Sequence, residues 1–211
     1  VNLAEKLAAV TPGKLQKTFF CSTGSEATEG ALLLASIYTG SSEIIALRNG
    51  LHGRTKLGMS VTGIQMWRTD PEPVGGIHFA PNPYCYRCPF AKTYPACDLH
   101  CAKELEKTIQ YTTSDNVAAF VAEAALGEGG IITPPDGYFE EIKKVLDRHG
   151  ILLFVDEVQA GFGRTGKLFA IEHFDVEPDI LTMAKGIADG FPLSAAIARA
   201  EIADSFRPGD H

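Results

Sequence analysis

Two short apolar runs in the second half of the chain limit its fold more than any other feature. Residues 151–155 (ILLFV) lead into Asp156 and Glu157, and residues 180–184 (ILTMA) lead into Lys185. A run of four to six apolar residues without alternation is typical of a strand buried on both faces, as in a parallel sheet. Each run therefore predicts a central strand with an ionisable group at its carboxyl end, the edge where open α/β sheets bind ligands.

Taken singly, Asp156 and Lys185 need no functional role. An Asp at the end of a strand commonly caps a turn or the next helix, and most lysines are solvated. The glycine-rich connection at 160–167 (AGFGRTGK) separates the two groups. Because both groups are expected at the same edge of the sheet, we interpret them as parts of one site.

The rest of the chain alternates predicted strands with predicted helices or loops. Apolar runs predict strands at 17–22, 43–47, 77–80, 117–122, 151–155, 180–184 and 193–198. Helical periodicity predicts helices at 2–10, 26–38, 97–111 and 136–149, a short helical patch at 168–174 and the opening of a helix at 201–206. This alternation predicts one α/β domain with a mostly parallel central sheet and flanking helices.

The composition is that of an ordinary globular protein. Apolar residues make up 45% and charged residues 21%, and 19 basic against 26 acidic residues give a net charge of −7. No cluster of Lys or Arg favours nucleic acid or an anionic membrane as a partner. No apolar run approaches the roughly 20 residues of a membrane span, and the first residues lack a secretory pattern. We therefore expect a cytoplasmic protein.

The segment Thr23-Gly24-Ser25 stands at the start of the helix predicted for 26–38. Unpaired N–H groups and the helix dipole make such a position a ready anion site. Ser25 could equally serve only as an N-cap. His52 and Arg54 follow the strand predicted for 43–47, where His52 alone would more often be a structural hydrogen-bonding residue.

One cofactor needs this combination of groups, namely a phosphorylated pyridine aldehyde. Lys185 offers the amine for a Schiff base with the aldehyde. Asp156 offers a carboxylate that keeps the ring nitrogen protonated, and a protonated ring stabilises a carbanion at the substrate carbon. The helix N-terminus at Gly24 and Ser25 offers a site for the phosphate.

Several segments resemble the class III aminotransferases, which are pyridoxal-phosphate enzymes of fold type I. Residues 154–195 look like the signature of that family, and residues 22–35 (STGSEATEGALLLA) resemble its phosphate loop. Residues 51–55 (LHGRT) are similar to its aromatic-His-Gly-Arg-Thr loop, and residues 121–135 resemble its glutamate-containing loop. The loops are similar to those of 4-aminobutyrate, other ω-amino-acid and acetylornithine aminotransferases.

The resemblance implies a role for each matching residue. Lys185 would bond the cofactor aldehyde and shuttle the proton between substrate and cofactor carbons, and Asp156 would pair with the pyridine N–H. Val158 would pack on one ring face, and Gln159 would hydrogen-bond the phenolic oxygen. The remaining implied contacts are Gly24 and Ser25 to the phosphate, Leu51 and His52 to the cofactor, and Arg54 and Glu123 to the substrate.

Leu51 departs from the family pattern, which has Tyr or Phe stacked on the ring at this position. Stacking is then weaker, or it comes from His52 or another residue. The chain also starts and stops inside the family pattern, so we expect residues 1–211 to be part of the pyridoxal-phosphate-binding large domain, with a cysteine-rich insert at about 82–101 and without the small domain. Because family members form their site between two subunits, a homodimer is expected for the full-length protein.

The insert carries four cysteines at a spacing that can bind metal. Thiolates at C-x2-C and C-x3-C spacing can hold zinc or an iron–sulfur cluster, whereas disulfides are not expected in a reducing cytosol. The alternative is a set of reduced, packed thiols, because the eight-residue separation is shorter than a usual zinc-ribbon loop. The four residues are Cys85, Cys88, Cys97 and Cys101.

The leading functional expectation is transamination between an amino acid and a 2-oxo acid. The amino acid is expected to be an ω-amino acid such as 4-aminobutyrate, or an ornithine-like one. A racemase or epimerase would use the same residues but return the proton to the opposite face of the same substrate carbon. An inactive fragment is the third alternative.

Overall fold

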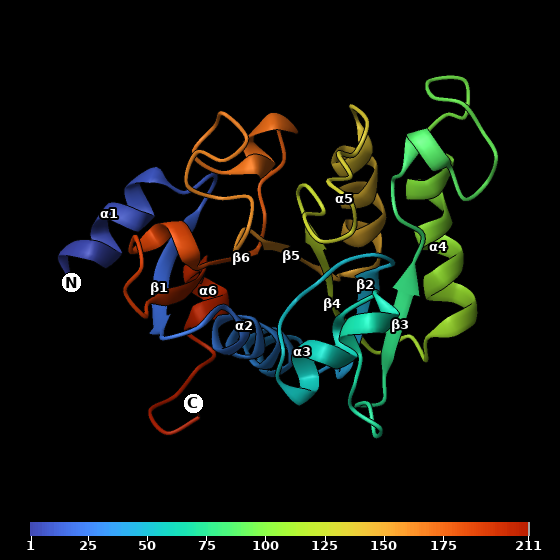
Figure 1. Ribbon diagram of the computed structural model, residues 1–211. Helices are drawn as coiled ribbons and strands as arrows, with labels where there is room; N and C mark the ends of the chain where they lie inside the picture. Colours follow the sequence, from blue (N-terminus) through green and yellow to red (C-terminus); the bar gives the residue numbers. More distant parts are fainter. Residues whose placement is uncertain (211) are drawn as a thin grey trace.

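A seven-stranded sheet runs through the centre of the computed structural model, which describes residues 1–210 (Figure 1). The strand order is β1-β7-β6-β5-β4-β2-β3. The strands are β1 (Leu15–Cys21), β2 (Glu43–Leu47), β3 (Ile77–Ala80), β4 (Val117–Glu123), β5 (Leu152–Asp156), β6 (Ile180–Met183) and β7 (Ser194–Arg199). Strand β7 runs antiparallel to both of its neighbours, and the other pairings are parallel. The predicted α/β fold with a mostly parallel sheet is confirmed.

Helices cover both faces of the sheet (Figure 1). The helices are α1 (Asn2–Val10), α2 (Gly24–Thr39), α3 (Lys56–Val61), α4 (His100–Thr112), α5 (Tyr138–His149) and α6 (Ala200–Ala203), with 3-10 turns η1 (Gln65–Trp67), η2 (Cys85–Arg87), η3 (Ala170–His173) and η4 (Lys185–Ile187). Side chains of α4 and α5 belong to one hydrophobic core, and side chains of α2 belong to a second core on the opposite face. The result is a three-layer arrangement.

Strands β4 and β5 are buried along their whole length, as the apolar runs at 117–122 and 151–155 predicted. Register pairing aligns their last residues, so that Glu123 lies beside Asp156, and Asp156 lies beside Thr182 of β6. Strands β1, β2, β4, β5 and β6 all point the same way. Their carboxyl ends therefore meet at one edge, where the loops that follow them form a common site.

Predicted and observed elements differ mainly at their ends. Helix α4 begins at His100 rather than at Cys97, because the backbone of Asp98 and Leu99 is left-handed (φ 50° and 51°). Helix α3 was not predicted, since its six residues are too short to show a helical period. Among residues 1–210, no helix is both long and apolar enough to span a bilayer.

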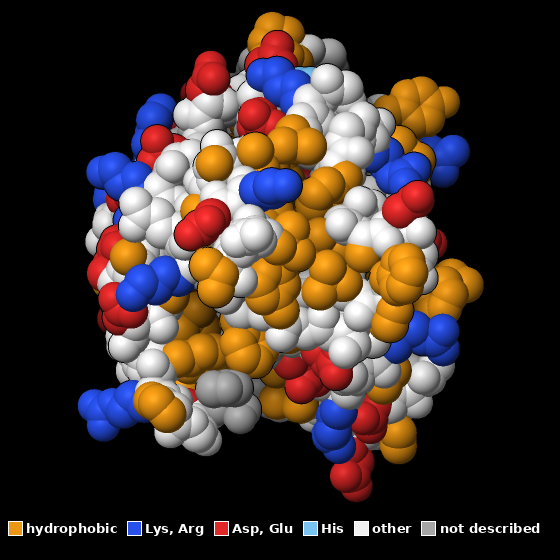
Figure 2. Space-filling model, turned by 90° about the vertical axis from the view of Figure 1, so that its left-hand side faces the viewer, with side chains coloured by type: hydrophobic (Ala, Val, Ile, Leu, Met, Phe, Trp, Pro, Cys, Tyr) orange, Lys and Arg blue, Asp and Glu red, His pale blue; other side chains and the backbone are white. Residues whose placement is uncertain are grey.

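Hydrophobic side chains gather on the face formed near α1 and β1, which Figure 2 shows from the front. Leu3 and Val10 of α1 and Phe20 of β1 are among the exposed large hydrophobic residues. Contiguous apolar surface of this kind usually marks a place where another protein surface packs.

Candidate active site

A cavity of about 420 Å³ opens at the carboxyl edge of the sheet. Its size lies within the range of small-molecule sites. The cavity is lined by every residue that the sequence predicted for cofactor or substrate: Gly24, Ser25, Leu51, His52, Arg54, Glu123, Asp156, Val158, Gln159 and Lys185. The structure therefore brings together loops that follow five different strands.

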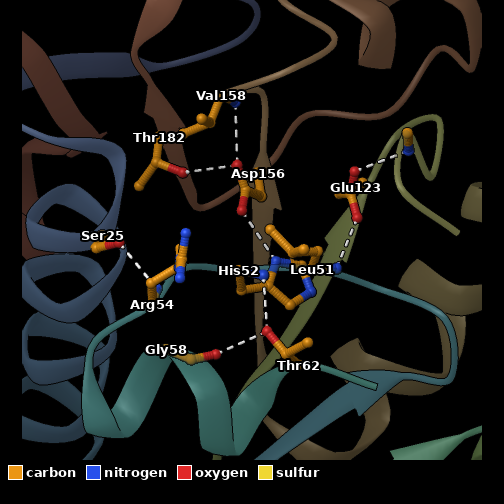
Figure 3. A network of polar contacts seen from close by, with 11 residues as sticks. Ser25, Leu51, His52, Arg54, Gly58, Thr62, Glu123, Asp156, Val158 and Thr182 are labelled. Carbon is orange, nitrogen blue, oxygen red and sulfur yellow. Dashed lines mark hydrogen bonds and ion pairs between the residues drawn. The ribbon is translucent and has the colours of Figure 1, made fainter. Parts of the chain in front are cut away.

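Asp156, the last residue of β5, is held by three neighbours and is 3% exposed. Its Oδ1 accepts the N–H of Val158 (3.0 Å) and the hydroxyl of Thr182 (3.4 Å). Its Oδ2 lies 2.9 Å from Nδ1 of His52 (Figure 3). These contacts fix a buried carboxylate at the wall of the cavity.

The buried imidazole of His52 holds the Asp156 carboxylate through a hydrogen bond. Burial alone lowers the pKa of His52, but the hydrogen bond to Asp156 and the charge of that carboxylate outweigh burial, so the pKa is raised overall. The backbone N–H of His52 donates to Oγ1 of Thr62 (3.1 Å), which in turn donates to the carbonyl of Gly58 (2.8 Å) (Figure 3). Packing of the His52 ring on the cofactor stays a prediction, because the hydrogen bond to Asp156 uses only one edge of the imidazole.

The start of α2, with Gly24 and Ser25, lines the cavity and is the candidate anion cradle. The alternative role of Ser25 as the N-cap is not what the structure shows. Thr23 is the N-cap rather than Ser25, and it forms a capping box with Glu26. Oγ1 of Thr23 accepts the N–H of Glu26 (3.2 Å), and the Glu26 carboxylate accepts the N–H of Thr23 (2.8 Å). The N–H groups of Gly24 and Ser25 belong to the first helical turn and have no carbonyl within the helix to bond.

Two glycines let the cradle approach the neighbouring loops. A Cβ on Gly24 would lie 3.0 Å from Cγ1 of Val158, and a Cβ on Gly53 would lie 2.9 Å from Oγ of Ser25. Gly53 also has φ +133°, which side-chain-bearing residues rarely adopt. Because Oγ of Ser25 accepts the N–H of Arg54 (3.0 Å), the loop after β2 is fastened to the first turn of α2.

Lys185 follows β6 by two residues and opens the turn η4. Its backbone is left-handed, with φ +46°. Non-glycine residues in this region are uncommon and occur preferentially at functional sites. The turn carries the chain away from the sheet edge and leaves the lysine at the cavity wall.

Glu123 ties two loops together and is 4% exposed. Its Oε1 accepts the N–H of Leu51 (2.9 Å), and its Oε2 accepts the N–H of Gly127 (2.9 Å) (Figure 3). Burial raises its pKa. Both oxygens are already used within the protein, so a direct substrate contact by Glu123 stays a prediction.

The further residues that line the cavity include Trp67, Glu128 and Phe191, which the sequence did not single out. Glu128 lies in the glycine-rich loop after β4, so its place in that loop was a usable signal. Trp67 and Phe191 lie in turns without periodicity, and no local pattern connects them to the other site residues.

Glu157 is a buried carboxyl next to Asp156 that does not line the cavity. Its Oε1 accepts the N–H of Ile171 (2.8 Å), while its Oε2 has no hydrogen-bond partner among the described residues. Burial raises the pKa of Glu157 to about 7. The side chain anchors η3 to the end of β5.

The four cysteines of the insert line a second, smaller cavity. All are free thiols, and burial raises the pKa of Cys101 to about 11 and also raises that of Cys85. Within residues 1–210, no group of three or more His, Cys, Asp or Glu side chains is arranged to hold a metal ion. Metal binding by Cys85, Cys88, Cys97 and Cys101 stays a prediction.

The chain matches known proteins over its whole length. The class III aminotransferase family profile covers residues 1–211. A leucine/methionine racemase of Thermococcus litoralis is 43% identical over 99% of this chain and 48% of its own length, and an acetylornithine aminotransferase of Methanopyrus kandleri is 41% identical over 99% and 48%.

The fold also matches solved structures. The crystal structure of an amine transaminase from an uncultivated Pseudomonas species, in its PLP-bound form, superposes with a TM-score of 0.91. That protein is 37% identical, and the match covers 97% of this chain and 48% of the other. The chain spans about half the length of the proteins that it matches.

Proposed function

The chain belongs to the class III aminotransferases, and from that premise we propose that it forms the cofactor-binding part of an enzyme that moves an amino group from an amino acid to a 2-oxo acid, with pyridoxal phosphate as cofactor. The observation that carries the proposal is the convergence of a helix N-terminus, a buried carboxylate and a lysine on one cavity. These groups match the phosphate, the ring nitrogen and the aldehyde of pyridoxal phosphate.

The residues of the cavity fit this cofactor. The N–H groups of Gly24 and Ser25 at the start of α2 suit a phosphate, and the absence of a side chain on Gly24 lets the helix start pack closely against Val158. The Asp156 carboxylate, held by His52, suits a protonated ring nitrogen. When bound, pyridoxal phosphate supplies an electron-withdrawing ring that stabilises negative charge on the substrate carbon.

The proposed work of the protein is to hold the cofactor and move one proton. Asp156 accepts the ring N–H, and His52 keeps that carboxylate in place. Lys185 would supply the amine that bonds the aldehyde, and as a free amine it would carry the substrate proton as a general base and acid. Val158 packs on the ring, Gln159 bonds the phenolic oxygen, and Arg54 binds a substrate carboxylate.

The wider assignments are part of the same proposal. We infer that residues 1–211 lie in the large, cofactor-binding domain and that the full-length protein is a cytoplasmic homodimer. The apolar face near α1 and β1 supports a protein contact on that side (Figure 2). The amino donor is proposed to be an ω-amino acid such as 4-aminobutyrate or an ornithine-like amino acid, for which the similarity to an acetylornithine aminotransferase is the support.

Racemisation is the second candidate, favoured by the similarity to a leucine/methionine racemase. The same lysine and ring would serve, but the proton would return to the opposite face of the substrate carbon. Full-length protein is incubated with one enantiomer of an amino acid in the absence of any 2-oxo acid. Loss of optical purity under these conditions supports the racemase, whereas amino transfer that depends on the 2-oxo acid supports the aminotransferase.

Cofactor attachment tests the assignment of Lys185. Full-length protein with added pyridoxal phosphate is expected to show a visible absorption band of the lysine-bound cofactor. The band should be lost in Lys185→Ala and kept in Lys144→Ala, a matched change at an exposed lysine of α5. A band that survives Lys185→Ala contradicts the assignment.

A further inference from the structure

Trp67 and Arg54 contact each other in the lining of the cavity, and they come from two different segments of the chain. The guanidinium carbon of Arg54 lies 5.7 Å from the centre of the Trp67 ring. Arg54 belongs to the loop after β2, whereas Trp67 ends the turn η1. Both residues line the cavity.

Arg54 is fixed at its backbone and free at its charged end. Its N–H donates to Oγ of Ser25 (3.0 Å), so the residue cannot leave the start of α2. Its guanidinium takes part in none of the ion pairs found between residues 1 and 210. A permanent cation without an acidic partner thus faces the space in which a substrate would lie.

The contact with Trp67 uses one part of the guanidinium and leaves another part available. Cation–π attraction acts between the positive charge of the guanidinium and the face of the indole ring, and it uses no N–H group in a hydrogen bond to an oxygen. The N–H donors point outward in the plane of the group, and this edge is the part that forms paired hydrogen bonds to a carboxylate. The contact with Trp67 therefore restricts the position of the Arg54 guanidinium and leaves its N–H donors available to a carboxylate.

We propose that Trp67 is a positioning residue for the substrate carboxylate, because it holds the Arg54 guanidinium in the lining of the cavity and leaves its N–H donors available. The inference rests on the proposed function and sharpens it, since it assigns carboxylate-bearing donors a preference over simple amines of the same length. A cation–π contact at an exposed position corresponds to about a two- to five-fold effect on an equilibrium. An effect of that size is expected on carboxylate recognition alone.

The test compares substrates that differ only in the carboxylate. Full-length wild type, Trp67→Leu and Trp67→Phe are assayed with an amino acid and with an amine of the same chain length in which a methyl group replaces the carboxylate, such as 4-aminobutyrate and butylamine. In Trp67→Leu, the KM for the amino acid relative to that for the amine is expected to rise about two- to five-fold. Trp67→Phe retains an aromatic face and should show a smaller rise.

Two controls separate positioning from general damage. Met66→Ala changes the exposed neighbour of Trp67 in η1, and the KM ratio should stay at the wild-type value. In an Arg54→Gln background, Trp67→Leu should have no further effect on the ratio. A Trp67→Leu variant that shifts both substrates equally, or that still shifts the ratio without Arg54, overturns the proposal.

A binding measurement keeps this inference distinct from the proposed function. Titration of the cofactor-loaded protein with glutarate, a dicarboxylate that cannot donate an amino group, is expected to give a Kd about two- to five-fold weaker in Trp67→Leu. If wild type transfers no amino group but the Kd for glutarate still differs between wild type and Trp67→Leu, only the proposed function fails. If wild type is active and the Kd is unchanged in Trp67→Leu, only the role of Trp67 fails.

Discussion

Replacing Glu157 with glutamine should change how the stability of the protein depends on pH. In the folded chain, burial raises the pKa of Glu157 from its ordinary value of 4.5 to about 7. The folded state therefore holds this proton more tightly than the unfolded state does. The contribution of Glu157 to the unfolding free energy is fully present below about pH 4.5, falls as the pH rises toward about 7 and levels off above that value.

The size of the effect follows from the shift. Each unit of pKa difference corresponds to about 1.4 kcal/mol, so ionisation of Glu157 should cost about 3 kcal/mol of unfolding free energy once the pH exceeds about 7. Between pH 5 and pH 8, about 2 to 3 kcal/mol of this cost should appear. Glu157→Gln keeps an oxygen to accept the N–H of Ile171 and cannot ionise, so this part of the pH dependence should disappear.

The assay is urea unfolding of the cofactor-free, full-length protein at pH 5, 6, 7 and 8. Wild type and Glu157→Gln share all other titrating groups, so the difference between their unfolding free energies isolates residue 157. Relative to wild type, Glu157→Gln should become progressively more stable as the pH rises. Glu5→Gln, the same change at an exposed carboxylate of α1, serves as the control and should show no such trend. A difference that stays constant from pH 5 to pH 8 would refute the reasoning.

Three other perturbations follow from the site and its surroundings. Thr23→Ala removes the side-chain cap of α2 and should lower the unfolding free energy by about 1 kcal/mol, measured by urea unfolding of the cofactor-free protein. Asp156→Asn removes the charge that raises the pKa of His52, so that pKa should fall on titration followed by NMR, and the protein should bind pyridoxal phosphate at least about ten-fold more weakly in a spectrophotometric titration. Elemental analysis of protein purified without oxygen tests the cysteine insert, which contains Cys85, Cys88, Cys97 and Cys101. Zinc or iron in stoichiometric amount supports a metal site if it is lost when serine replaces the cysteines. Absence of both metals from the wild-type protein rules the site out.

Much of the fold was predictable because its central strands leave a strong local signal. β4 and β5 are covered on both faces, so nearly every residue in them is apolar, and their charged last residues mark where the strands end. Since parallel strands share one carboxyl edge, placing Asp156 and Lys185 in one site needed no knowledge of distant contacts. The cavity joins them with the three other predicted segments, at 24–25, 51–54 and 123, for the same reason.

Features that depend on loops were not predictable in the same way. His52 and Asp156 pair across 104 residues, and no periodicity announces such a contact. Trp67 reaches the cavity from a three-residue turn for which the sequence supplies no helical or strand pattern. The N-cap was ambiguous because Thr23 and Ser25 both carry hydroxyl groups, and the choice depends on a helix start that shifts by only two residues.

The double attachment of Glu123 has a mechanical consequence. One buried carboxylate fastens the loop that carries Leu51 and the loop that carries Gly127, so these two loops are held side by side at the cavity. Neither loop can move away alone without leaving one buried oxygen of Glu123 without its hydrogen-bond partner, so the two loops are mechanically coupled.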